Sequence, residues 1–90
     1  MCTAQGQVYL FGGRDEHARQ NDLHQLDPAT YTWTAPPCVG YRPAPRAFAA
    51  MAGTAGALVL YGGRHANESL LGDLHVYNID QSIWIPVSPP

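Results

Sequence analysis

The sequence predicts an all-β chain built from two copies of one four-stranded antiparallel unit, the first copy incomplete. One motif recurs at an interval of 50 to 51 residues, and two of its apolar runs end at a pair of glycines. The chain has nine glycines and eight prolines in 90 residues, a higher share than the roughly 12 % of an average protein. No segment shows the 3.6-residue period of an amphipathic helix.

The repeat is carried by three pieces of sequence that keep the same order. The segment 8–14, VYLFGGR, recurs 50 residues later as LVLYGGR at 58–64. The segment 22–27, DLHQLD, recurs 51 residues later as DLHVYN at 73–78, and Trp33 recurs as Trp84. Met1 then aligns with Met51, so the counterpart of Arg46–Met51 would lie before residue 1. We therefore expect repeat 1 at 1–39, with its first strand missing, and repeat 2 at 40–90.

Each predicted strand has a local reason. The runs Val8–Phe11 and Ala57–Tyr61 are continuously apolar and end at Gly-Gly, which is typical of strands buried on both faces. The strands that follow, Leu23–Leu26 and Leu74–Tyr77, stop at residues that favour turns. The last predicted strands, 31–34 and 83–87, carry the tryptophans. The alanines of 46–52 favour a helix by propensity, but the register of the repeat predicts a first strand there.

The repeated glycines, tryptophans and histidines are expected to serve the structure. Glycine allows positive φ and close backbone approach, which suits Gly12, Gly13, Gly62 and Gly63 at the ends of buried strands. A tryptophan on an outer strand covers much apolar surface between neighbouring sheets, so Trp33 and Trp84 are predicted at such positions. Because His24 and His75 repeat in register, they are expected to pack, and Arg46 is expected to form hydrogen bonds near the junction of the units.

The pattern resembles the kelch repeat. The resemblance rests on the apolar run ending in Gly-Gly, the following Asp-Leu-His, the turn Asp27-Pro28-Ala29-Thr30, the tryptophan, and Pro43-Ala44-Pro45-Arg46 before the next unit. The chain departs from it once, since Phe48 or Ala49 stands where many kelch repeats have a histidine. The resemblance implies four-stranded blades of a β-propeller, and the linker is similar to that of the kelch subgroup with Rab effectors and host-cell factors.

The resemblance further implies protein partners bound through loops on one face of the propeller. The candidate loops are 14–21, 36–45 and 64–72, which hold most of the charge. Because arginine pairs with carboxylates in a bidentate manner, an acidic peptide is the expected ligand. The candidate binding residues are Arg14, Asp15, His17, Arg19, Arg42, Arg64, His65 and Glu68, although the same charges could simply solvate turns.

Other classes of function find little support in the sequence. Five basic and seven acidic residues give no electrostatic footprint for nucleic acid or an anionic membrane. No apolar run approaches a membrane span, and the first residues lack the features of a signal peptide, so a cytoplasmic or nuclear location is expected. Cys2 and Cys38 fit no metal spacing. No cofactor or metal is expected.

An enzyme is the least favoured interpretation. Some kelch-like propellers are metal-dependent enzymes, and Glu68, Asp73 and His75 lie close in sequence. Their spacing does not match those enzymes, however, and no nucleophile–base pair or phosphate loop is present.

A remaining alternative is that the chain is an inactive fragment of a larger propeller. Repeat arrays need about three units for stability, and propellers carry about 4–8 blades. The seven predicted strands cannot close into a ring, so the end sheets would expose apolar faces. We therefore expect further kelch blades or a second copy of the chain to cover those faces.

Overall fold

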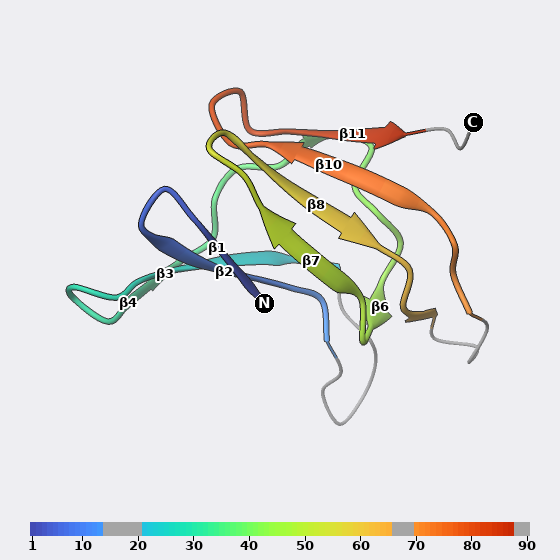
Figure 1. The fold of residues 1–90 in the computed structure, drawn as a ribbon, viewed down its shortest axis with the longest axis horizontal. Coiled ribbons are helices and arrows are strands. Elements are labelled where there is room, and N and C mark those ends of the chain that lie inside the picture. The colour runs from blue at the N-terminus through green and yellow to red at the C-terminus, as the bar shows by residue number, and fades with distance from the viewer. Residues whose placement is uncertain (14–20, 66–69, 88–90) are drawn as a thin grey trace.

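The computed structural model describes residues 1–13, 21–65 and 70–87, and in these ranges the chain is all-β, as expected (Figure 1). The first sheet has the order β1 (Cys2–Ala4), β2 (Gln7–Phe11), β3 (Leu23–Asp27) and β4 (Thr32–Thr34). The second has the order β5 (Val39–Gly40), β11 (Ile83–Val87), β10 (Leu74–Asn78), β8 (Ala57–Tyr61) and β7 (Ala50–Gly53). The short strands β6 (Arg46–Ala47) and β9 (Arg64–His65) pair separately. No helix able to span a membrane occurs within the described ranges.

The first unit, expected to be incomplete and to lack its first strand, has a shortened first strand. Cys2–Ala4 forms β1, which pairs antiparallel with β2 in the register Cys2↔Tyr9. In the second sheet Ala52 faces Val59 in the same way, so β1 is a short counterpart of β7. When the two repeats are aligned so that Met1 corresponds to Met51, Cys2 corresponds to Ala52. A strand of three residues carries too little alternation to be recognised from the sequence.

The single first strand expected over 46–52 is in fact two strands, β6 and β7. Phe48 lies between them with φ of +63°, a conformation that is strained for a bulky residue. The bend separates β6, which pairs with β9, from β7, which joins the second sheet. This path requires a glycine at position 63, where φ is +101°. A Cβ at this position would lie only 2.8 Å from the Ala47 carbonyl oxygen.

Two further elements lie in segments expected to be loops. Val39–Gly40 adds to the second sheet as β5, the only parallel strand among the described residues, in the register Ile83↔Val39. Arg64–His65 forms β9. The predicted strand 31–34 begins one residue later, because Tyr31 has φ of +55° and belongs to the turn.

The two sheets pack face to face through alternate residues of their central strands. In β2 the buried residues are Tyr9 and Phe11, and in β8 they are Leu58 and Leu60. Because successive side chains of a strand point to opposite faces, one face of each sheet is buried against the other. The common core comprises Ala4, Tyr9, Phe11, Leu23, Leu58, Leu60, Tyr77 and Trp84.

The sheets approach each other most closely at strands β1 and β7, which lie side by side in Figure 1. A Cβ added to Gly53 would overlap the Thr3 carbonyl oxygen, and it would lie 3.1 Å from the Ala4 Cβ. The Gln5 side-chain amide donates a hydrogen bond of 2.8 Å to the Ala55 carbonyl. Only a residue without a side chain therefore fits at position 53.

We expect Gly53→Ala to destabilise the chain by about 3 kcal/mol, the upper end of the usual cost of overpacking, because β1 must move away from β7. Gly56→Ala is the matched control, since its Cβ would meet only the Asp80 carboxylate, at 3.8 Å. Thermal and urea unfolding measure the difference. Equal stability of the two variants would contradict the close contact.

Candidate interaction surface

Trp84 is the centre of the contact between the two sheets. Its indole is 1 % exposed, and the Phe11 ring meets it at 5.3 Å between centroids with an interplanar angle of 67°. Tyr77 packs at 5.2 Å and His75 at 6.5 Å from the same indole. The Tyr77 hydroxyl donates a hydrogen bond of 2.6 Å to the Pro37 carbonyl, which fixes the linker between the sheets to this core.

The equivalent tryptophan of the first sheet has no such cover. Trp33 is 52 % exposed, although it contacts His24 at 6.3 Å much as Trp84 contacts His75. Strand alternation and register place Trp33 on the face of the first sheet that points away from the second. We call this face the first end face; it comprises Val8, Leu10, His24, Leu26 and Trp33.

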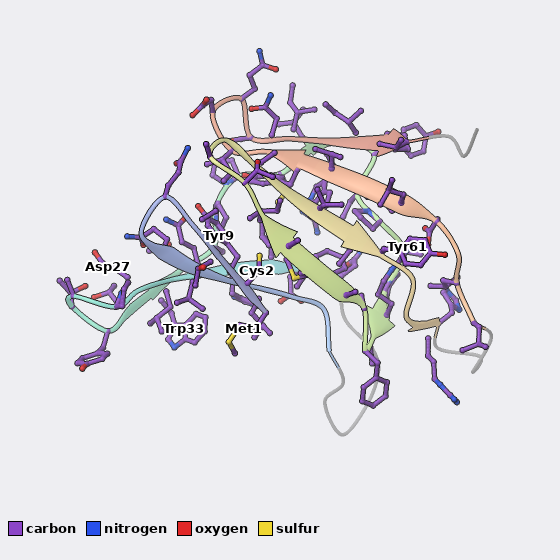
Figure 2. All side chains as sticks on the ribbon, viewed as in Figure 1. Met1, Cys2, Tyr9, Asp27, Trp33 and Tyr61 are labelled. Atoms are coloured by element: carbon purple, nitrogen blue, oxygen red, sulfur yellow. The ribbon has the colours of Figure 1, made fainter. Side chains whose placement is uncertain are left out.

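The second sheet has an uncovered face at the opposite side of the molecule. Tyr61 is 53 % exposed, whereas its counterpart Phe11 is buried on Trp84. Figure 2 shows Trp33 and Tyr61 on opposite sides of the fold. We call this face the second end face; it comprises Val59, Tyr61, Leu74, Val76 and Ile85. Each end face is the side of its sheet that the other sheet does not cover.

A buried arginine holds the second sheet to the preceding linker. The Arg46 side chain is fully buried, and two of its nitrogens donate to the two carboxylate oxygens of Asp73 at 2.6 and 2.9 Å. It also donates to the carbonyls of Gly62 and Ala44. The Arg46 guanidinium holds the pKa of Asp73 well below its usual range, and the hydrogen bond from His75 lowers it further. Arg46 therefore joins β6, the Gly62–Gly63 bend and the start of β10.

The bases of the three predicted binding loops meet on one face. Gly13 donates its amide proton to the Arg46 carbonyl at 2.9 Å, and the Asn21 side chain donates to the Pro43 carbonyl at 3.2 Å. Arg64 pairs with Ala47 through β6 and β9. The linker before β6 thus lies between the ends of the other two loops, which supports a composite loop surface.

The predicted binding residues are only partly within the described ranges. Arg42 and Arg64 are exposed there, and His65 is half-buried. Arg14, Asp15, His17, Arg19 and Glu68 lie outside the described residues. The binding role of all eight residues stays a prediction.

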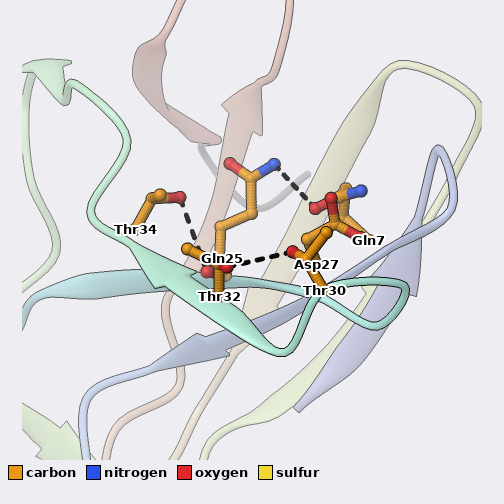
Figure 3. A pocket seen from close by; sticks show the side chains of 6 residues that line it. All are labelled: Gln7, Gln25, Asp27, Thr30, Thr32 and Thr34. Atoms are coloured by element: carbon orange, nitrogen blue, oxygen red, sulfur yellow. Dashed lines mark hydrogen bonds between the residues drawn. The ribbon is translucent and has the colours of Figure 1, made fainter.

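A polar pocket of about 440 Å³ opens on the first sheet, at the end that carries the β3–β4 turn (Figure 3). Within it, the Gln25 amide donates to the Gln7 side-chain oxygen at 3.3 Å, and the hydroxyls of Thr30 and Thr32 are hydrogen-bonded. The lining residues are Gln7, Gln25, Asp27, Thr30, Thr32 and Thr34. This site was not predicted from the sequence. The two repeats carry one signal of its polar character, because the apolar Ala57, Val76, Ile83 and Ile85 stand at four matching positions in the second repeat.

The chemistry available in the pocket is hydrogen bonding. Its lining holds one carboxylate, two carboxamides and three hydroxyls, with no histidine, cysteine or basic residue. No group of three or more histidine, cysteine, aspartate or glutamate residues that could hold a metal occurs within residues 1–13, 21–65 and 70–87. These side chains can bind a polar ligand but offer no paired nucleophile and base.

The Arg46–Asp73 pair makes stability depend on pH. A carboxyl group with a lowered pKa in the folded state stabilises the fold above its unfolded pKa, near 4, and this stabilisation is lost as the pH falls towards the folded value. We expect the free energy of unfolding of the wild type to fall more steeply between pH 7 and pH 3 than that of Asp73→Asn. The variant should be about 3 kcal/mol less stable at pH 7, because it leaves a buried arginine without its counter-charge.

Urea denaturation at several pH values measures both effects. The control is Asp80→Asn, which changes an exposed carboxylate and should keep the pH dependence of the wild type. Parallel pH profiles for the wild type and Asp73→Asn would contradict the role of this pair.

The chain is similar in sequence to several known proteins. A family model described as the KLHDC2/KLHL20/DRC7 Kelch-repeats domain matches residues 1–90. The Rab9 effector protein with kelch motifs from Bos taurus is 34 % identical over 86 residues, which cover 92 % of this chain and 23 % of that protein. Kelch domain-containing protein 2 from Bos taurus is 32 % identical over 90 residues, which cover 99 % of this chain and 22 % of that protein.

This chain thus spans less than a quarter of the length of these relatives. Members of this family are typically non-enzymatic scaffolds for protein interactions. The family fold is the β-propeller, and the two open sheets of this chain form part of one. Both sheets contain four antiparallel strands, to which β5 adds a fifth in the second sheet. These sheets, the repeated Gly-Gly and tryptophan positions and the family match over residues 1–90 agree, and the chain belongs to the kelch-repeat family.

Proposed function

We propose that this chain is a non-catalytic protein-interaction module whose two kelch blades stack against further blades and present a loop surface to a partner protein. The observation that carries the proposal is the contrast between two equivalent tryptophans. Trp84 is 1 % exposed beneath a neighbouring sheet, and Trp33 is 52 % exposed without one. Contiguous exposed apolar surface of this kind marks a site of interaction.

The two end faces are complementary to each other by repetition. The first end face repeats the residues with which the second sheet meets the first, since Trp33 corresponds to Trp84 and His24 to His75. The second end face repeats the opposing side, since Tyr61 corresponds to Phe11 and Leu74 to Leu23. A second copy can therefore dock head to tail, with its Tyr61 on Trp33 as Phe11 lies on Trp84. Such a contact is heterologous and can continue until a ring closes.

The loop surface is proposed to bind an acidic segment of the partner. Arg42 and Arg64 are exposed close to the meeting point of the loop bases, and arginine pairs with carboxylates in a bidentate manner. The names of two relatives mention Rab9 and a Rho GTPase-activating protein, which supports a protein partner without identifying it.

A second candidate is that the two blades act only as part of a larger propeller. This candidate is favoured by the lengths of the relatives, because the matched region makes up about a fifth to a quarter of the length of each kelch relative. In that arrangement the end faces meet blades of the same polypeptide, and the chain alone binds no partner.

For the end faces, we expect the wild-type chain to self-associate with rising concentration in sedimentation velocity experiments. Trp33→Glu and Ile85→Glu each place a charge on one end face and should weaken association at least tenfold. Tyr41→Glu is the control, since it changes an aromatic residue that is 79 % exposed in the linker. A wild type that stays monomeric, or equal association of all variants, would contradict head-to-tail docking.

For the loop surface, we expect acidic peptides from a charge-patterned library to bind more tightly than the same peptides with asparagine and glutamine in place of aspartate and glutamate. Binding should weaken with salt and fall by fivefold or more in the double variant Arg42→Glu, Arg64→Glu. Fluorescence anisotropy measures the affinities. If both peptide sets bind equally, the loops do not recognise acidic segments.

A further inference from the structure

We propose that the polar pocket of the first sheet binds a neutral ligand rich in hydroxyl groups, of the carbohydrate class. The proposal is independent of the proposed function, because it involves neither the end faces nor the loop surface. It rests on the place of the pocket in the fold, on the apolar residues at the matching positions of the second repeat, and on the hydrogen-bonding groups that the lining leaves unused.

The pocket lies on the face of the first sheet that is directed towards the second sheet. Gln7 points to the same side of β2 as Tyr9, since the two are separated by one residue. Gln25 stands opposite Tyr9, and Thr34 stands opposite Gln25, so all four side chains share this face. Tyr9 is 2 % exposed in the common core, whereas Gln25 is half-buried and Thr34 is exposed. The pocket is therefore the part of a covered face that the neighbouring sheet leaves accessible.

The fold does not require polar residues at these positions. The strands of the second sheet pair in the same order and with the same register as those of the first, yet four of the matching residues there are apolar. In place of Gln7, Gln25, Thr32 and Thr34 the second repeat has Ala57, Val76, Ile83 and Ile85. The polar lining is thus a property of one repeat, and the shared architecture does not account for it.

The lining leaves both acceptors and donors unused. Asp27 Oδ1 accepts a backbone amide of the following turn at 2.9 Å, and its Oδ2 has no partner among the described residues. Gln25 Nε2 donates to Gln7 Oε1 at 3.3 Å, which leaves Gln25 Oε1 and Gln7 Nε2 available. The Thr30 hydroxyl donates to that of Thr32 at 3.0 Å, so the Thr32 hydroxyl proton can be donated to a ligand. These residues line one cavity (Figure 3).

This mixture of groups favours a sugar over other classes of ligand. A hydroxyl group both donates and accepts, so a sugar can satisfy the acceptors and the donors together. The Asp27 carboxylate disfavours an anion, since the lining holds no basic residue. An ammonium group only donates and would leave the Gln7 amide and the Thr32 hydroxyl unpaired, which is costly. The volume of about 440 Å³ falls in the range of small-molecule sites, roughly 300–1,000 Å³.

The test is a titration of the ¹⁵N-labelled full chain with glucose, galactose, mannose, N-acetylglucosamine and lactose. We expect at least one of these sugars to give saturable shifts at the side-chain amides of Gln7 and Gln25 and at the backbone amide of Thr32. The amides of Val76 and Ile83, at matching positions of the second repeat, should not shift. Lysine amide and inorganic phosphate are the cationic and anionic probes, and neither should give saturable shifts.

Three variants localise the site, and dispersed spectra establish that each is folded. Gln25→Val introduces the residue of the second repeat and should weaken sugar binding at least tenfold. Asp27→Asn keeps an oxygen for the turn but loses the charged acceptor, and it should weaken binding about fivefold. Gln81→Val, which changes an exposed glutamine in the turn after β10, is the matched control and should bind as the wild type does.

The proposal is overturned if none of the sugars gives saturable shifts, or if Gln25→Val and Asp27→Asn bind sugar as tightly as the wild type. Equal binding of lysine amide or phosphate would also overturn it, since the pocket would then recognise charge. None of these results bears on the end faces or the loop surface, which the sedimentation and acidic-peptide experiments test.

Discussion

The fold depends on the packing of Phe11 against the indole of Trp84. Neither sheet has a helix or a second layer of its own within the described residues, so each can bury its apolar residues only against the other. The edge-on contact of the two rings joins β2 of one sheet to β11 of the other, and Leu58, Leu60 and Tyr77 complete the core around it. A chain of 90 residues has little apolar area to spare, which makes this one interface decisive.

The two repeats allow equivalent residues to be compared within a single molecule. Trp33 and Trp84 share their strand position and their histidine neighbour, yet one is exposed and the other buried. Their environments differ because only one of them has a sheet in front of it. The unusually small share of charged residues, 13 %, has the same origin, since both faces of such a sheet are built to be covered.

The sequence predicted the central strands well, because continuous apolar runs ending in Gly-Gly mark β2 and β8 and the repeat fixes their partners. It failed where elements are too short to have a period, as in β1, β5 and β9. It also missed the break at Phe48, because nothing in a phenylalanine signals a positive φ. The partner of Arg46 lies 27 residues away at Asp73, and the polar pocket is assembled from three strands, so both required the folded chain.

Strand β5, which lies in the linker, makes the outer edges of the two sheets differ. By pairing with β11 through Val39 and Gly40, it occupies peptide groups of an outer strand that would otherwise face solvent. The outer strand of the first sheet, β4, receives no such strand from the described residues. An open strand edge is a template on which other chains can extend a sheet. Among the described residues β4 offers such an edge along its whole length, whereas β5 covers the Ile83–Trp84 part of β11. The linker between the repeats therefore also protects part of the second sheet against pairing with other chains.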